Sequence, residues 1–194
     1  MLKGAAILAA AALCCPVIAL AQEDTVAVEQ TADNAEMAEM FAQDQSARST
    51  PGVDWTVVAQ EDAQRRARTR ELLDAGELRT GQDYWHAAFI FQHGSEPRDY
   101  LLAHALAVHA IGLGHERASW IAAATLDRYL QATGAKQIYG TQSISRQGEP
   151  MTRDPYDREL LTDGLRAGAN VPSLEEQDAA LEAIQARIDA LMAD

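Results

Sequence analysis

The sequence predicts an all-α protein, a single domain of about six or seven helices packed as helical hairpins. Apolar residues recur every three or four positions through most of the chain after residue 33, and no segment shows the alternation typical of a strand. Helix-capping residues stand where several periodic segments begin. Small residues and a glycine turn give residues 105–130 a local tetratricopeptide or Sel1-like character, although one such helix pair is too few for a repeat array.

The first 21 residues are typical of a secretory signal peptide. Lys3 precedes an apolar run, and Ala19 and Ala21 occupy the positions that signal peptidase recognises. The run is short and alanine-rich compared with a membrane-spanning helix. We therefore expect a mature chain that begins at Gln22, lies in the periplasm or is secreted, and has no membrane span.

Composition narrows the function classes. Both cysteines lie in the predicted leader, so the mature chain would have no thiol chemistry, cysteine metal site or disulfide. Cleavage would leave 15 basic residues against 29 acidic residues, a net charge of −14 that disfavours nucleic acid and anionic lipid as partners. Residues 22–32 are acidic and lack helical periodicity, which predicts a disordered spacer before a helical domain over residues 33–194.

Two helices are predicted at the start of this domain. The first covers residues 34–48, where four side chains recur at helical spacing: Met37, Met40, Phe41 and Asp44. Asp54 can cap a second helix over residues 55–75, which Gly76 ends.

The next two helices form the centre of the predicted fold. Thr80 and Asp83 make a capping box before an almost wholly apolar helix that ends at His93. Ser95 and Pro97 suit the N-cap and first turn of a helix that reaches about residue 113. Two seams at helical spacing predict that each buried face of this helix carries one histidine: Leu101, His104, Val108 and Ile111 in one, and Leu102, Leu106, His109 and Leu113 in the other.

Three further helices complete the fold. One covers residues 116–133 and ends at Gly134, and another is predicted over residues 154–168. The last begins at a capping box of Ser173 and Glu176 and has a single apolar stripe: Leu181, Ile184, Ile188 and Leu191.

The histidines are candidates for acid–base chemistry, because they titrate near neutral pH. His86 and His104 lie nine residues on either side of Ser95, so in an antiparallel helix pair they can meet, and His93 shares the face of His86. The alternative is that these are core histidines, each with a carbonyl or carboxylate partner. The single His-Glu dipeptide lacks the second histidine of a zinc-protease pair, so we expect no metal and no cofactor.

Two Asp-Arg pairs are the other charged candidates. Asp44 and Arg48 lie four apart with Gln45 beside them, where the alternative is a solvated ion pair. Asp127 and Arg128 lie within an apolar pattern, so burial of Asp127 would require a partner for its carboxylate.

The segment GAKQIYGTQSIS follows the fifth helix and has no helical or strand pattern. Gly140 can take a positive φ, Tyr139 can bury its ring, and Thr141 and Gln142 offer donors and acceptors. This turn can present its amides to a ligand; the alternative is an ordinary turn that packs Tyr139 on the core.

The strings DQSAR, HAAFIFQHG and KQIYGTQ, in this order, resemble a bacterial family of uncharacterised exported helical domains over roughly residues 38–180. The family has no activity to carry over. The resemblance implies that a set of polar residues recurs as one site: Asp44, Gln45, Arg48, Gln92, His93, Thr141 and Gln142.

This set favours a small-ligand-binding or protein-interaction module, whose partner is a small polar ligand or an envelope protein. The alternative is a hydrolase that uses His93 and Asp44 as a general acid–base pair. In either case we expect Thr141 and Gln142 to find their hydrogen-bond partners among Gln92, His93, Asp44 and Arg48.

Overall fold

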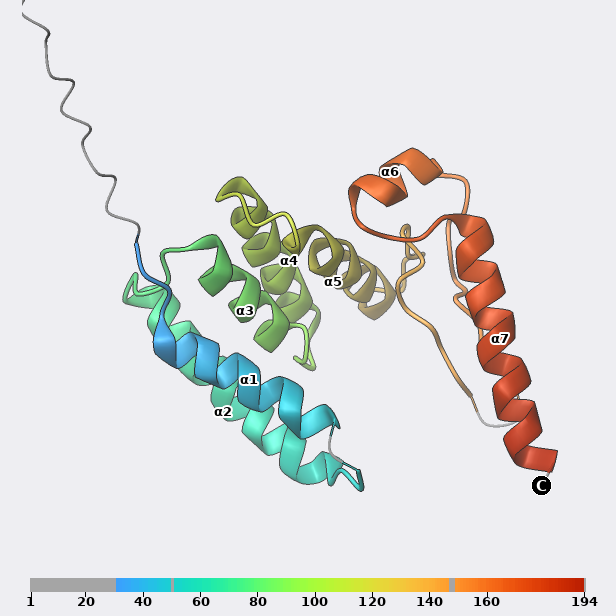
Figure 1. Ribbon diagram of the computed structural model, residues 1–194, viewed down its shortest axis with the longest axis horizontal. Coiled ribbons are helices and arrows are strands. Elements are labelled where there is room, and N and C mark those ends of the chain that lie inside the picture. The colour runs from blue at the N-terminus through green and yellow to red at the C-terminus, as the bar shows by residue number, and fades with distance from the viewer. Residues whose placement is uncertain (1–30, 50, 147–148, 194) are drawn as a thin grey trace, which may run out of the picture. The chain divides into compact units, whose positions relative to one another are not determined.

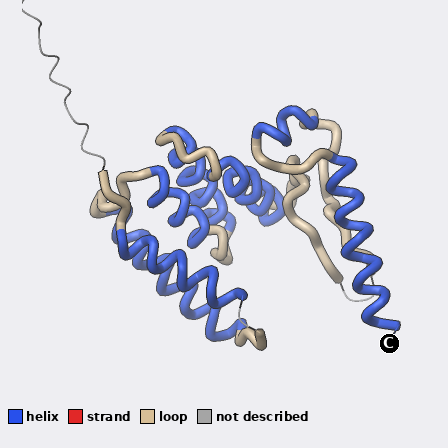
Figure 2. Tube along the Cα trace, in the orientation of Figure 1, coloured by secondary structure: helices blue, strands red, loops and turns tan. Residues whose placement is uncertain are grey.

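The computed structural model describes residues 31–49, 51–146 and 149–193, which belong to one compact unit that begins at Thr31. Seven helices form this part of the chain: α1 (Ala35–Ser49), α2 (Trp55–Asp74), α3 (Gly81–Phe91), α4 (Pro97–Gly112), α5 (Ala118–Ala132), α6 (Asp163–Gly168) and α7 (Leu174–Ala193) (Figure 1). Figure 2 shows helices and loops but no strand among the described residues. Two isolated bridges join Gln137 to Tyr156 and Ile144 to Thr152. The predicted all-α class is confirmed.

Two predictions about the N-terminal region concern residues that the structure does not describe. The predicted leader, residues 1–21, and most of the predicted spacer, residues 22–32, lie outside the described residues. Among the helices that are described, none combines the length and apolar character needed to cross a membrane.

The core lies around α3, which packs against α1, α2 and α4, while α4 packs in turn against α5. Each of these five helices contributes fully or almost fully buried side chains to the core, among them Met37, Leu72, Ile90, Ala107 and Ile121. The predicted N-caps explain where two of these helices begin. Asp54 accepts hydrogen bonds from the amides of Thr56 and Val57, and Thr80 forms the capping box with Asp83.

The buried face of α4 differs from the two predicted seams. Its buried residues are Ala103, Leu106, Ala107 and Ala110, whereas the large side chains of one seam and the end of the other are 38% to 50% exposed: Leu101, Val108, Ile111 and Leu113. Alanines at the contact allow neighbouring helices to approach more closely than leucines or isoleucines do. The seam prediction was therefore wrong for these four residues and for the exposed His109, whereas Leu106 is buried and Leu102 is half-buried against the core.

Two element boundaries also differ. The N-cap of α4 is Glu96, not Ser95, with Pro97 in the first turn as predicted. The helix predicted over residues 154–168 shortens to α6, which begins after Thr162. The segment before it runs beside Gln137 instead: the Gln137 amide donates to the Pro155 carbonyl at 3.0 Å, and the Gln137 carbonyl accepts from the Asp157 amide at 2.9 Å.

The last helix, α7, begins at the predicted capping box, in which a Glu176 oxygen accepts from the amide and hydroxyl of Ser173, each at 2.8 Å. Its apolar stripe is only partly covered: Leu181 and Ile188 are half-buried and Ile184 is 43% exposed. The side chain of Leu191 lies outside the described residues.

Candidate functional site

A buried charge network joins α1, α2 and the end of α3. Asp44 of α1 is 1% exposed, and its Oδ1 accepts from His93 Nδ1 at 3.0 Å and from Arg48 Nη1 at 2.8 Å. Arg48 also donates to Asp62 of α2 at 2.5 Å, and Arg65 donates to the other oxygen of Asp62 at 2.7 Å. The predicted Asp44–Arg48 pair is therefore not a solvated surface pair but part of an interior network.

The same groups resemble a metal site in spacing but not in electrostatics. One ligand atom from each of Asp44, Asp62 and His93 lies within 4.8 Å of the others. Each carboxylate oxygen of the two aspartates already accepts a hydrogen bond, including Asp44 Oδ2 from Gln45 at 2.7 Å. Guanidinium groups thus neutralise the carboxylates that a cation would need. Burial raises the pKa of the Asp62 carboxyl, but the hydrogen bonds from Arg65 and Arg48 outweigh this effect and hold the pKa below its ordinary value.

His93 presents one ring nitrogen beyond this network. Because a carboxylate oxygen accepts from Nδ1, this nitrogen carries the hydrogen, and in the neutral ring Nε2 is the acceptor. Within the described part of the chain no donor bonds to Nε2, and the side chain is 16% exposed. Gln92 beside it is only 6% exposed, and its side-chain amide makes no hydrogen bond to the described residues. Both groups remain available to a ligand.

Two half-buried arginines near the α3–α4 turn, Arg66 and Arg128, have no carboxylate partner among the described residues. Arg66 donates to the His93 carbonyl at 2.9 Å. Arg128 of α5 has a buried Nε without an acceptor in the described residues, and burial lowers the pKa of its guanidinium, with a smaller contribution in the same direction from the charge of Arg48. The Tyr100 phenol, whose hydroxyl donates to the Gly94 carbonyl at 2.9 Å, acts on this pKa in the opposite direction.

The turn that follows α5 is organised by Asp127, which is fully buried. Its Oδ1 accepts from the amides of Ile138 and Tyr139 at 2.8 and 3.0 Å, and its Oδ2 from the amide and hydroxyl of Thr141 at 2.9 and 2.7 Å. The expectation that a buried Asp127 finds a partner is confirmed. Because Asp127 occupies these amides, the turn does not present them to a ligand.

The partners of Thr141 and Gln142 are a correction to the sequence prediction. Gln142 donates from its side chain to the Ala124 carbonyl at 3.3 Å, and its amide donates to Gln137 Oε1 at 3.0 Å. The hydrogen bonds of this turn therefore go to α5 and to its own segment rather than to Gln92, His93, Asp44 or Arg48. The three resembling strings form two separate hydrogen-bond networks, one around Asp44 and one around Asp127.

Gly140 allows this turn to pack against the C-terminal segment. Its φ is 77°, and a Cβ there would clash with Gln177 Oε1 and lie 2.7 Å from the Tyr156 ring. Tyr156 and Gln177 both donate to the Tyr139 carbonyl, at 3.1 and 3.0 Å. These contacts hold the backbone of Tyr139 and thereby the direction in which its side chain extends.

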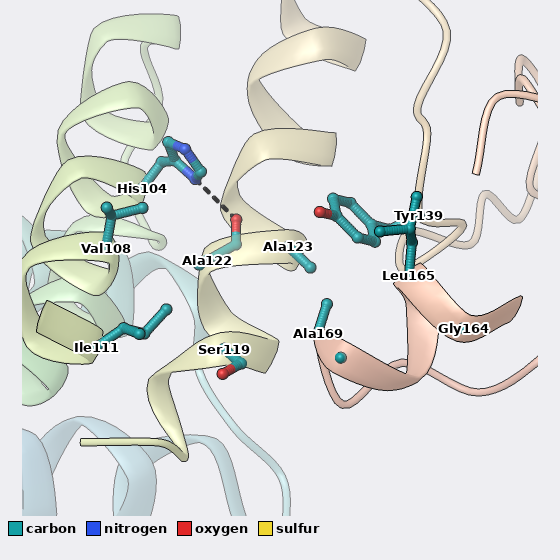
Figure 3. Close-up of a pocket in the computed structure, with 11 residues that line it drawn as sticks. His104, Val108, Ile111, Ser119, Ala122, Ala123, Tyr139, Gly164, Leu165 and Ala169 are labelled. Carbon is teal, nitrogen blue, oxygen red and sulfur yellow. Dashed lines mark hydrogen bonds between the residues drawn. The ribbon is translucent and has the colours of Figure 1, made fainter. Parts of the chain in front are cut away.

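A pocket of about 400 Å³ lies between α4, α5 and α6, and two of the predicted candidates, His104 and Tyr139, line it. Figure 3 shows the Tyr139 ring extending from its turn toward Ala123 of α5. His104 Nδ1 donates to the Ala122 carbonyl at 2.9 Å, so in the neutral ring Nε2 is an acceptor. The pocket is otherwise mostly apolar.

His86 and His104 belong to different surroundings, so the expected contact between them is not formed. The ring of His86 stacks on Phe41 with centroids 4.3 Å apart, and its Nε2 accepts from Gln82 Nε2 at 2.6 Å. Gln82 in turn accepts from His115 Nε2 at 3.1 Å. His86 is thus buried in the core, as the alternative interpretation held, but its Nδ1 has no carbonyl or carboxylate partner among the described residues.

The groups that complete both networks are not among the residues predicted from the sequence. In the first network these are Asp62 and Arg65, three positions apart on one face of α2, a spacing that itself signals an ion pair. In the second they are Tyr156, Arg166 and Gln177, which carry no local signal because they reach the turn only through the tertiary fold.

Neither a family model, a curated protein nor a solved structure matches the chain. The resemblance to a family of exported helical domains therefore stays a prediction, and the tetratricopeptide or Sel1-like character of α4 and α5 is not confirmed.

Proposed function

We propose that this domain is a small-ligand-binding module whose polar site lies at the α3–α4 turn, with His93 as its central hydrogen-bonding group. The observation that carries this proposal is the geometry of His93: the buried carboxylate of Asp44 fixes the ring through Nδ1, while Nε2 remains available. A ring held by a buried partner loses little conformational freedom on binding, which favours recognition. The preceding residue, Gln92, has a side-chain amide without a hydrogen-bond partner among the described residues.

The charges around this turn favour a ligand with an anionic group. In a chain of net charge −13, Arg66 and Arg128 have no carboxylate partner in the described residues. Arginine binds carboxylates and phosphates through paired N–H donors. The ligand class is therefore a small polar molecule that bears a carboxylate or a phosphate.

Inorganic phosphate and acetate are suitable probes for this site. We expect either anion to shift the Nε–Hε resonance of Arg128 and the imidazole resonances of His93 in a saturable manner, with chloride at equal ionic strength as the reference. Binding should be lost in Arg128→Gln and retained in Arg187→Gln, an exposed arginine of α7 without an ion pair to the described residues. Equal shifts with chloride and with both probes would reject an anion site.

The second candidate is a hydrolase, because a buried aspartate that orients a histidine through Nδ1 is also the arrangement of a general base. Hydrolysis of p-nitrophenyl acetate, phosphate or glucoside distinguishes the two. Turnover that disappears in His93→Ala, in a protein that remains folded, supports the enzyme. Absence of turnover together with saturable anion binding supports the binding module.

A further inference from the structure

We propose that the pocket between α4, α5 and α6 is a second ligand site, which binds a small uncharged molecule with an apolar body and one hydroxyl group. This site is separate from the one at His93. Its lining includes no residue of the Asp44 network and neither Arg66 nor Arg128.

Large apolar side chains are exposed around this hollow. Val108 and Ile111 of α4 are 50% and 38% exposed, and Leu165 of α6 is 58% exposed. Figure 3 shows Val108 and Ile111 on one side of the hollow and Leu165 on the other, with Ala122 and Ala123 of α5 between them. An apolar molecule seated there would remove these side chains from water, which stabilises the complex by the hydrophobic effect.

The lining excludes a charged ligand. None of the eleven lining residues is an aspartate, glutamate, lysine or arginine, although 23% of the chain is charged. A charged group would therefore lose its hydration without gaining a counter-charge. A volume of about 400 Å³ falls in the range of about 300–1,000 Å³ typical of small-molecule pockets.

Two polar groups in the lining can each bond a ligand hydroxyl. His104 Nε2 is an acceptor in the neutral ring, and the Tyr139 hydroxyl has no hydrogen-bond partner in the described residues. The third polar lining group, the Ser119 hydroxyl, already donates to the Glu116 carbonyl at 2.7 Å. A ligand hydroxyl can donate to His104 Nε2 or accept from the Tyr139 hydroxyl, so either group can bind it.

Hydrogen bonds of Arg166 and Tyr156 hold the pocket walls in place, which favours a preformed site. Arg166 of α6 is fully buried and donates to the carbonyls of Leu161 and Arg158 at 2.6 and 3.0 Å and to the Tyr156 hydroxyl at 3.2 Å. The same hydroxyl donates to the Tyr139 carbonyl at 3.1 Å. Tyr139 and α6 are therefore fixed by one chain of hydrogen bonds, so a ligand need not order them.

2-Naphthol is a probe of the stated chemistry. In the full chain, labelled at its methyl groups, we expect saturable chemical-shift changes that fit one dissociation constant at Val108, Ile111 and Leu165. Tyr139→Phe should weaken binding roughly two- to tenfold, the effect of one hydrogen bond. His93→Ala should leave the dissociation constant unchanged, so failure of the anion site and failure of this one are separate results.

Filling the pocket is the decisive variant. Gly168 lines the pocket, its φ is not in the left-handed region, and no heavy atom lies within 4 Å of a Cβ built on it, so Gly168→Leu adds a large side chain at the pocket wall without a backbone clash. Gly112→Leu is the matched control, because Gly112 has the same open surroundings but does not line the pocket. Loss of binding in the first variant alone supports the site. Absence of saturable shifts in the unmodified protein, or equal binding by both variants, overturns it.

Discussion

His93 Nδ1 lies 3.0 Å from Oδ1 of Asp44, a carboxylate that is 1% exposed. The contact spans 49 residues and joins the end of α3 to the middle of α1. Because Asp44 also binds Arg48, and Arg48 binds Asp62, the imidazole is tied to α2 through the same network. The orientation of the candidate site thus depends on a buried ion-pair network rather than on apolar packing alone.

Replacement of Asp44 by alanine should be strongly destabilising. It would leave the Arg48 guanidinium with one carboxylate fewer and His93 without its partner, and loss of one member of a buried ion pair costs about 3–5 kcal/mol. Urea denaturation followed by circular dichroism measures this loss. Glu39→Ala on the same helix is the control: Glu39 is exposed and bonds only to Gln43, so its effect should lie within about 0.5 kcal/mol. Equal effects would contradict the network as described.

His86 predicts a loss of stability in mild acid. Burial lowers its pKa from 6.5 to about 4, because the charged ring would lose its hydration; Asp83 and Asp33 oppose this shift and His115 adds to it. The hydrogen bond from Gln82 Nε2 likewise requires an unprotonated Nε2. The unfolded chain therefore binds a proton between pH 6.5 and 4 that the folded protein does not bind.

The sign follows from this difference in proton binding. The contribution of His86 is fully present above pH 6.5 and decreases as the pH falls toward 4, by up to about 1.4 kcal/mol per pH unit. His86→Phe keeps an aromatic ring against Phe41 but does not titrate, so its stability should depend less on pH across this interval. Urea midpoints at pH 7, 5.5 and 4.5 provide the test. Parallel curves for the two proteins would show that His86 does not carry the effect.

Local signals predicted the helices well where the decisive interactions are local. Asp54 and Thr80 cap within three residues of themselves, so their roles follow from sequence spacing alone. The buried face of α4 depends on how closely α3 and α5 approach, which no residue of α4 encodes by itself. Apolar spacing within α4 therefore misassigned Val108 and Ile111 to the core, and the structure places them at a pocket instead.

The same contrast between local and tertiary interactions applies to the candidate site. The Asp44–Arg48 pair and the buried Asp127 followed from helical spacing and apolar context. The partner of Asp127 did not, because a turn 11 to 14 residues later folds back onto α5 rather than onto α3. Polar composition indicated that the turn needs partners, but only the fold determines which ones it finds.

Asp127→Asn tests how the turn is held. Both carboxylate oxygens accept two hydrogen bonds, so the amide nitrogen of an asparagine would face donors on one side whichever way it is placed. We expect a loss of about 2–4 kcal/mol and faster hydrogen exchange at the Tyr139 and Thr141 amides. Asp157→Asn, whose side chain makes no hydrogen bond to the described residues, is the control and should change neither quantity. Unaltered exchange in Asp127→Asn would contradict this role.

Substitutions at Gly140 and Gly134 distinguish the cost of backbone strain from the cost of a packing clash. The two residues have similar backbone conformations but different surroundings. Their φ angles are 77° and 78°, but a Cβ on Gly134 meets no heavy atom within 4 Å, whereas one on Gly140 meets Gln177 and the Tyr156 ring. Gly134→Ala should therefore show only the cost of a left-handed alanine, about 1–2 kcal/mol. Gly140→Ala should add the clash, typically a further 1–3 kcal/mol. Equal losses in urea denaturation would show that the C-terminal segment does not pack on the turn, because strain alone affects the two positions equally.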